Sequence, residues 1–568
     1  MTHYMFMLAF ALAFLGSLVD AAIVERTFHV GNMTITKLCQ TRVITAVNQQ
    51  MPGPTLEVSE GDKVIIHVLN HSPYNMTIHW HGVFQKLSGW ADGPNMITQC
   101  PIQPGNKYTY KFNIIGQEGT LWWHAHVSFH RATVYGVLII LPREGPHTYP
   151  FPKPHHEVPI LLGEWWNANV VDLADEAYVK GGAPNKSDVF TINGKPGDFY
   201  NCSEKDMYKL KVEYGKKYMF RIINAALNSE LFFKVAGHNF TVMAVDASYT
   251  NPYKTDVIVI APGQTVDALM AADAAPDKYY MAALRYEASG GVSFDNTTTR
   301  GIVEYYNTSP TSQPVMPTMP AYKDTLTANR FYTNLTGLLR PGKPTVPLTV
   351  NHRMFVTFGF GRVKCESDQL LCNQTTGALA ASMNNVSFQF PSSASLLAAH
   401  YKNLKGIYMR GFPDKPPVFF DFTNESMNTD PALTPLVHTL KGTKVTKVKY
   451  NSTVEMVLQN TAIVVAENHP LHLHGFNFYV LAQGLGNYNK SEAVEKYNLV
   501  DPQMRNTIAV PGGGWAVIRF KANNPGVWIM HCHLDAHLQF GLATAFEVEN
   551  GPTPDTILPP PPPDYPKC

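Results

Sequence analysis

Apolar and polar residues alternate along many short stretches of this chain, and glycine or proline interrupts the alternation. Three stretches share the pattern and end in asparagine: EGDKVIIHVLN at 60–70, YGKKYMFRIIN at 214–224 and KYNSTVEMVLQN at 449–460. A period of two places successive side chains on opposite faces of a β-strand. The pattern therefore predicts strands, and its recurrence predicts three related β-domains.

A second repeated stretch follows each of the first three and reads as strand, turn and strand. Its copies are PGNKYTYKF…GTLWWHAH, APGQTVDALM…DKYYMAAL and VPGGGWAVIRF…GVWIMHCH. In this frame His-Ala-His at 124–126 corresponds to Met-Ala-Ala at 281–283 and to His-Cys-His at 531–533. The outer two domains therefore carry possible metal ligands, and the middle domain has lost them.

Short strands with Gly/Pro turns predict an all-β protein of three Greek-key β-sandwich or barrel domains. Its 42 prolines, 40 glycines and only 16% charged residues agree with this class. The predicted domains are 22–145, 158–310 and 346–568, with a Pro/Thr/Ser-rich linker at 311–345. The end, LPPPPPPDYPKC, cannot join a sheet and should form an extended strap tied back through Cys568.

Residues 1–21 are predicted to be a secretory signal peptide, because an apolar run from Met5 to Val19 precedes small residues. The run is too short to span a bilayer, and no other stretch approaches that length. There is no apolar C-terminal tail of the GPI type either. We therefore expect a soluble, secreted mature protein without a membrane segment.

Charge and cysteine content agree with an extracellular protein. Lys+Arg 45 against Asp+Glu 44 gives no indication of nucleic-acid binding. Asn-x-Ser/Thr sequons such as the one at Asn32 fit a glycosylated chain. If Cys532 binds a metal, six of the seven cysteines remain, enough for three disulfides in an oxidising compartment. Cys365 and Cys372 are close enough in sequence to close a local loop.

The stretch HCHLDAHLQFGL at 531–542 organises the predicted chemistry. On a strand, His531 and His533 point to one face and Cys532 points to the other. A thiolate with imidazoles is typical of a blue-copper electron-transfer centre. The two imidazoles on the opposite face indicate a second metal site directly behind the first.

Four His-x-His pairs lie at matching repeat positions, and each places two imidazoles on one strand face. The pairs are His79/His81, His124/His126, His472/His474 and His531/His533. Two metals with three imidazoles each and one with two would use all eight rings, which converge only if the outer domains pack together. His469, Cys532 and His537 would complete a separate His₂Cys site, and this redox-suited set disfavours zinc. We assign the other twelve of the 22 histidines to surface or packing roles.

The chain resembles the blue multicopper oxidases, specifically the laccases of plants. The motifs that carry the likeness are HWHG, WADGPNMITQCPI, GTLWWHAH, HPLHLHG and HCHLDAHLQFGL, and it covers essentially the whole mature chain. The resemblance implies three cupredoxin domains and four copper ions: one type 1, one type 2 and two type 3. The implied ligands are His469, Cys532 and His537 for type 1; His79 and His472 for type 2; His81, His124 and His533 for one type 3 ion; and His126, His474 and His531 for the other. It also implies the disulfides Cys39–Cys202 and Cys100–Cys568, with Cys365–Cys372 left over.

The resemblance further implies a mechanism. A phenol such as a lignin precursor would dock near an exposed edge of His469 and give one electron to the type 1 copper, and O₂ would become two waters at the trinuclear cluster. Asp92 and Asp535 are candidate proton-relay carboxylates; alternatively they are turn or cap residues, and Asp535 could instead orient a ligand ring. Leu542 stands at the axial position and cannot coordinate, which should raise the reduction potential and favour methoxyphenols over ascorbate.

The leading expectation is a monomeric laccase in the plant cell wall (the apoplast) that builds or degrades lignin. A ferroxidase would need acidic residues beside His469, and an ascorbate oxidase would be expected to have methionine at the position of Leu542. A non-catalytic wall protein should show eroded ligands, yet all ten histidines and Cys532 are present.

Overall fold

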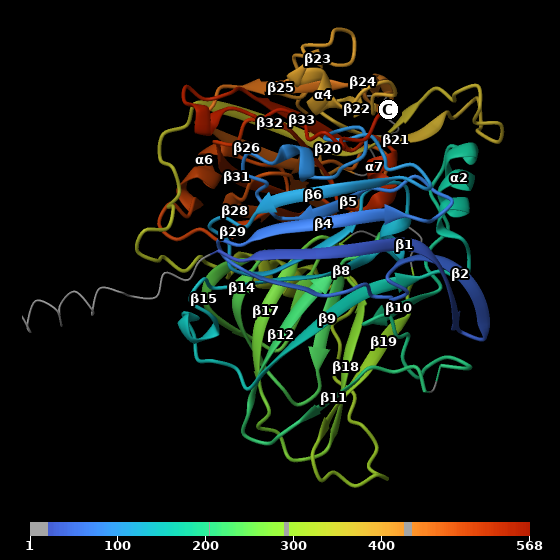
Figure 1. Cartoon of the computed structure of the whole chain (residues 1–568), viewed down its shortest axis with the longest axis vertical. Helices are drawn as coiled ribbons and strands as arrows, with labels where there is room; N and C mark the ends of the chain where they lie inside the picture. Colours follow the sequence, from blue (N-terminus) through green and yellow to red (C-terminus); the bar gives the residue numbers. More distant parts are fainter. Residues whose placement is uncertain (1–20, 204, 289–294, 425–433) are drawn as a thin grey trace, which may run out of the picture.

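The computed structural model describes residues 21–203, 205–288, 295–424 and 434–568. Within these residues strands predominate and form six sheets, which confirms the predicted all-β class (Figure 1). The predicted signal peptide lies, apart from Ala21, outside the described residues. Within the described part of the chain, no helix is long and apolar enough to cross a membrane.

The N-terminal part of the described chain forms two four-stranded sheets, with orders β2-β1-β4-β6 and β3-β8-β7-β5. Their strands are β1 (Ile23–Lys37), β2 (Gln40–Val47), β3 (Leu56–Ser59), β4 (Lys63–Asn70), β5 (Ile78–His81), β6 (Lys107–Asn113), β7 (Gly119–Ala125) and β8 (Tyr135–Leu141).

The middle part forms sheets β10-β9-β12-β17-β14-β15 and β11-β19-β18-β13-β16. Its elements are β9 (His156–Trp165), α2 (Val170–Lys180), β10 (Val189–Ile192), β11 (Lys209–Val212), β12 (Lys217–Asn224), β13 (Leu231–Val235), β14 (Phe240–Val245), β15 (Ser248–Thr255), β16 (Ile258–Ile260), β17 (Thr265–Ala271), β18 (Lys278–Arg285), β19 (Thr298–Tyr305) and α3 (Thr325–Thr333). Helix α3 falls inside the predicted linker, and its Phe331 and Tyr332 pack into the core of this part.

The C-terminal part forms sheets β24-β22-β21-β20-β26-β31-β28-β29 and β23-β25-β33-β32-β27-β30. Its elements are β20 (His352–Val363), β21 (Ala378–Met383), β22 (Val386–Phe388), α4 (Leu396–Tyr401), β23 (Met409–Arg410), α5 (Thr434–Val437), β24 (Leu440–Gly442), β25 (Lys444–Val448), β26 (Ser452–Asn460), β27 (His469–Leu473), β28 (Phe478–Leu485), α6 (Lys490–Ala493), β29 (Met504–Arg505), β30 (Thr507–Val510), β31 (Gly514–Ala522), β32 (Gly526–Cys532), α7 (Asp535–Gln539) and β33 (Ala543–Val548).

The three repeated stretches of the sequence fold as β4, β12 and β26, and these strands have equivalent neighbours. Each pairs in parallel with the first strand of its own part and antiparallel with a later one: β4 with β1 and β6, β12 with β9 and β17, and β26 with β20 and β31. The internal repeat is therefore a structural repeat.

The asparagine that ends each repeated stretch has a structural role. Asn70, Asn224 and Asn460 are buried, and each side-chain amide donates to two or more backbone carbonyl oxygens of neighbouring segments. In the C-terminal part, Asn460 donates to Glu467 O at 2.7 Å, two residues before His469. A buried amide needs these partners, so the asparagine holds the loop that leads into the next strand.

The N-terminal strands β1, β4 and β6 lie between the middle part and the C-terminal part (Figure 1). Buried or partly buried polar contacts join the parts: Arg221 with Thr120 at 2.7 Å, Arg505 with Asp246 at 3.1 Å, and Asn524 with Phe84 O at 2.7 Å. All three parts therefore contribute to the interior where they meet.

Three disulfides are present, Cys39–Cys202, Cys100–Cys568 and Cys365–Cys372, and this confirms the pairing implied by the resemblance. Cys532 is the free, buried cysteine. The proline-rich end runs back over the N-terminal part, where Trp90 Nε1 donates to Pro559 O at 2.8 Å and Tyr565 donates to Thr98 O at 2.9 Å. The predicted strap is confirmed.

The strap disulfide should stabilise the protein more than the local one, because it closes a separation of 468 residues rather than 7. Replacing both Cys100 and Cys568 by serine should reduce stability by about 2–4 kcal/mol, the usual effect of losing a disulfide. The matched control is serine at both Cys365 and Cys372. Calorimetric unfolding of both variants without reductant checks this, and an equal or larger loss in the control would contradict it.

Candidate metal centre

Strand register brings the histidine pairs together. On the N-terminal side, β5 pairs with β7 so that His79 lies opposite His124. On the C-terminal side, β27 pairs with β32 so that His472 lies opposite His531. Each pair of strands, together with the residues directly after the strand ends, therefore presents four rings. The two sets meet in one buried cluster between the outer parts of the chain.

The eight rings form groups in which one nitrogen of each ring lies within 4.8 Å of the others. The groups are His79, His81 and His472; His81, His124 and His533; and His126, His474 and His531. Facing nitrogens approach closely, as in His474 Nε2 to His531 Nε2 at 3.1 Å and His81 Nδ1 to His533 Nε2 at 3.1 Å. The Nε2 atoms of His79 and His472 are buried without a partner. Convergent, unpartnered imidazole nitrogens fit metal ions bound among them.

A fourth group lies on the opposite face of β32. Cys532 Sγ is 3.5 Å from His469 Nδ1 and 3.4 Å from His537 Nδ1, and the two nitrogens are 2.9 Å apart. Burial raises the pKa of the Cys532 thiol well above its usual value. A metal cation would supply the positive charge that a buried thiolate needs, and His₂Cys is a donor set that copper takes.

Burial lowers the pKa of eight of the clustered imidazoles and so favours their neutral form. It is the main cause that lowers the pKa of His531 to about 3. Burial likewise lowers the pKa of seven further rings well below the usual value, and neighbouring charges add to the shift; these rings are His81, His124, His126, His469, His472, His474 and His533. Neutral rings have the free lone pair that metal binding requires.

Asp92 orients two rings of the cluster. Its carboxylate accepts from His474 Nδ1 at 2.9 Å, and its backbone oxygen accepts from His79 Nδ1 at 2.7 Å. Both rings therefore turn Nε2 toward the other histidines. Gly93 permits this approach, because a Cβ there would lie 1.9 Å from Ile78 O and the residue has φ +99°.

Asp535 lies beside the cluster and pairs with Arg131 rather than with a ligand ring. The closest approach is 3.0 Å from Arg131 Nη2 to the carboxylate. Burial raises the pKa of Asp535, and Arg131 opposes that shift. Asp535 also lines a cavity of about 530 Å³ whose walls include α2 and His124, His126, His531 and His533. The cavity provides an approach to the histidine cluster for a small molecule.

The expectation of an exposed edge on His469 is wrong. Its ring is fully buried, and the rings of Phe358 and Phe360 pack against it with centroids at 5.5 and 5.7 Å. Both phenylalanines belong to β20, and sequence spacing does not reveal their contact with β27. Leu542 is fully buried in the same apolar cluster as Cys532, and its carbonyl oxygen accepts from the Cys532 N–H at 3.0 Å.

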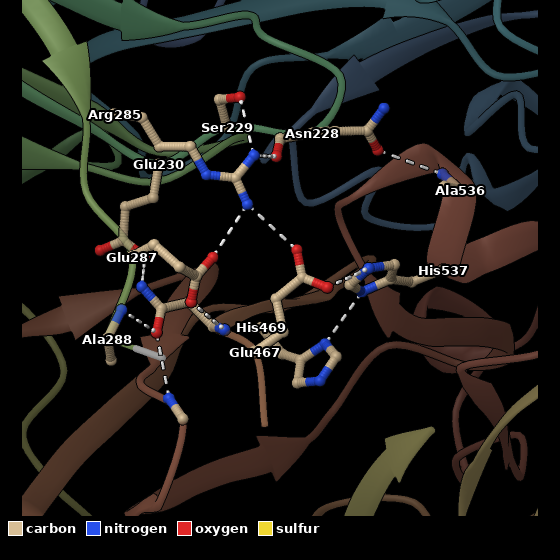
Figure 2. Close-up of polar contacts among 12 residues, drawn as sticks. Asn228, Ser229, Glu230, Arg285, Glu287, Ala288, Glu467, His469, Ala536 and His537 are labelled. Carbon is tan, nitrogen blue, oxygen red and sulfur yellow. Dashed lines mark hydrogen bonds and ion pairs between the residues drawn. The ribbon is translucent and has the colours of Figure 1, made fainter. Parts of the chain in front are cut away.

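The Cys532 group includes a carboxylate that was not predicted from the sequence. Glu467 Oε2 lies 3.3 Å from His537 Nε2, and Glu467 Oε1 lies 3.1 Å from Arg285 Nη2 of the middle part (Figure 2). Burial raises the pKa of Glu467, but His537 and Arg285 outweigh it and hold that pKa at about 2. Glu467 precedes His469 by two residues, and this spacing in the sequence could have identified it as a neighbour of the site. Arg285 is far from His469 in the sequence, so no local pattern predicted its contact.

The comparisons with known proteins agree with this geometry. Family models described as multicopper oxidase match residues 29–145, 156–308 and 411–552. The chain therefore belongs to the multicopper oxidase family, with three cupredoxin-like domains.

Similar proteins indicate which class of multicopper oxidase the chain belongs to. The chain is 58% identical to Laccase-7 of Arabidopsis thaliana over 99% of this chain and 98% of that protein, and 59% identical to Laccase-14 of Oryza sativa over 97% and 96%. The crystal structure of the laccase from Botrytis aclada matches with a TM-score of 0.69 and 27% identity, covering 93% of this chain and 88% of that one. Fet3p, at 21% identity and TM-score 0.71 over 93% and 90%, shares the fold. Within the family this chain is a laccase of the plant type, and it binds copper.

The role of Asp92 can be tested on copper binding. Asp92→Asn removes the charge that orients His474, so copper affinity of the histidine cluster should fall about 10–100-fold. Asp535→Asn is the matched control, because its partner is Arg131, and it should keep its copper. Copper content after dialysis against graded chelator measures both; unchanged retention in Asp92→Asn would contradict the orienting role.

Proposed function

We propose that this chain is a secreted, monomeric laccase of the plant cell wall that oxidises phenols and reduces O₂ to water. The observation that carries the proposal is the placement of β32 between two sites. Cys532 belongs to one donor group, and its sequence neighbours His531 and His533 belong to two others. Backbone and side-chain bonds thus connect the Cys532 group with the histidine cluster.

We assign the four copper ions as one type 1, one type 2 and two type 3. His469, Cys532 and His537 would hold type 1, and His79 with His472 would hold type 2. The type 3 sets are His81, His124 and His533, and His126, His474 and His531. When bound, these ions supply one-electron redox chemistry at the first site and the electrons for O₂ reduction at the cluster.

The remaining residues have separate tasks in this proposal. Asp92 orients His79 and His474, and Asp535 lies on the wall of the cavity through which O₂ enters and protons are delivered. Leu542 offers no ligand to the type 1 ion, which favours a high reduction potential. Cys532 provides the covalent connection between the sites.

Several features support a phenol as the electron donor. The curated relatives are laccases. Phe358 and Phe360 cover His469 and also line a shallow pocket with Val418, Phe420 and Ile463, an apolar surface suited to an aromatic ring. The carboxylate that a ferroxidase would use, Glu467, is buried and already paired with Arg285 and His537. The predicted signal peptide and sequons support secretion. Lignin-type phenols as substrates and a location in the cell wall are what the resemblance to plant laccases implies.

Oxygen uptake by the copper-loaded protein with a methoxyphenol tests the reaction, with peroxide assayed in the same cell. We expect one O₂ consumed per four phenols oxidised and no peroxide. Uptake with ferrous iron or ascorbate but not with phenol would overturn the substrate. No uptake with any donor despite full copper would overturn the enzymatic proposal.

Cys532→Ser tests the connection between the sites. The variant should lose the intense thiolate-to-copper absorption band and phenol oxidation, because serine does not replace the thiolate. The ten ligand histidines are unchanged, so copper at the cluster should remain measurable by metal analysis and paramagnetic resonance. Phenol turnover at the wild-type rate in this variant would contradict the proposed electron route.

A further inference from the structure

The middle domain has no copper ligands, yet its strand β18 ends at the type 1 group. Residues 281–283 of β18 correspond to the ligand triplets of β7 and β32. Two residues further along, Arg285 points out of the middle domain toward Glu467 and His537 (Figure 2). The strand that lost its histidines thus supplies a cation beside the thiolate site.

Arg285 holds two carboxylates at once. Its Nη2 lies 2.9 Å from Glu287 Oε2 and 3.1 Å from Glu467 Oε1, while Nη1 donates to Asn228 O at 3.2 Å. The side chains of Arg285, Glu287 and Glu467 are 6%, 2% and 6% exposed. Charges buried to this degree interact strongly and are weakly screened by salt.

The same segments also hold the residues next to the ligands. Asn468, which precedes His469, donates its N–H to Glu287 at 3.3 Å and its amide to Glu230 at 3.2 Å. Ala536, which precedes His537, donates its N–H to the Asn228 side chain at 3.3 Å. The middle domain therefore positions the backbone on both sides of the type 1 group, and Figure 2 shows the contacts together.

We propose that Arg285 is a positioning residue that controls how strongly Glu467 interacts with His537, and so sets the reduction potential of the type 1 copper. The inference rests on the type 1 assignment in the proposed function. A carboxylate that accepts a hydrogen bond from a ligand imidazole makes the ring a stronger donor and favours the oxidised ion. Arg285 forms an ion pair with the same carboxylate. It therefore weakens the influence of Glu467 on His537.

The two residues should therefore act in opposite directions. Glu467→Gln removes the negative charge from His537 and should raise the potential. Arg285→Gln leaves Glu467 and Glu287 without their shared cation and should lower it. Each change should alter the equilibrium constant for reduction about tenfold, the size expected for a buried hydrogen bond to a charged group.

The experiment is a redox titration of the thiolate-to-copper band in the copper-loaded wild type and variants. Arg285→Lys keeps the positive charge and should therefore restore most of the wild-type potential. It should not restore all of it, because lysine lacks the two-pronged geometry of the guanidinium. Arg519→Gln is the matched control, because it removes a buried arginine whose partner is Glu455, and its potential should equal that of the wild type.

Opposite shifts for Glu467→Gln and Arg285→Gln would support the inference. Unchanged potentials, or shifts of the same sign, with an intact band would overturn it while leaving the proposed function in place. If Arg285→Gln does not fold, the nearly isosteric Glu467→Gln decides alone: no upward shift overturns the inference. A wild type with full copper but no thiolate-to-copper band would overturn the type 1 assignment itself.

Discussion

The structure depends on burying ten closely packed imidazoles and one thiol in its interior. In most rings one nitrogen is hydrogen-bonded to an oxygen atom and the other faces neighbouring rings, as His472 does between Asn506 O and the cluster. In His469 and His533 the outer nitrogen is buried without a partner. Such an arrangement costs free energy unless metal ions bind the inward nitrogens. Strand register, the Asp92 loop and the packing of the outer domains all serve to place those nitrogens.

Much of this was accessible from the sequence. Alternation and the repeated strand ending in asparagine predicted the all-β repeat, because both depend on local periodicity and on a buried amide that needs fixed partners. The His-x-His pairs indicated which residues meet, since strand geometry alone puts two rings on one face. The disulfide pairing came from family resemblance, because spacing leaves the connectivity open.

Other features depend on contacts between domains and have no local pattern. The burial of His469 follows from Phe358 and Phe360 on β20, and its exposure was therefore predicted wrongly. Arg285 contacts Glu467 from the middle domain, which has no histidines at the positions where the outer domains have ligands. The middle domain also supplies Asp246 to Arg505 and Gln264 to Thr507 O, so it acts as a support for the copper sites rather than as a spacer.

Anomalous diffraction from crystals of the copper-loaded protein, recorded on both sides of the copper absorption edge, would locate the bound ions and identify their element. We expect four copper peaks: one among His469, Cys532 and His537, and three within the cluster formed by the four His-x-His pairs. A peak set that lacks the Cys532 position, or that disappears at the copper edge and appears at that of zinc, would contradict this expectation.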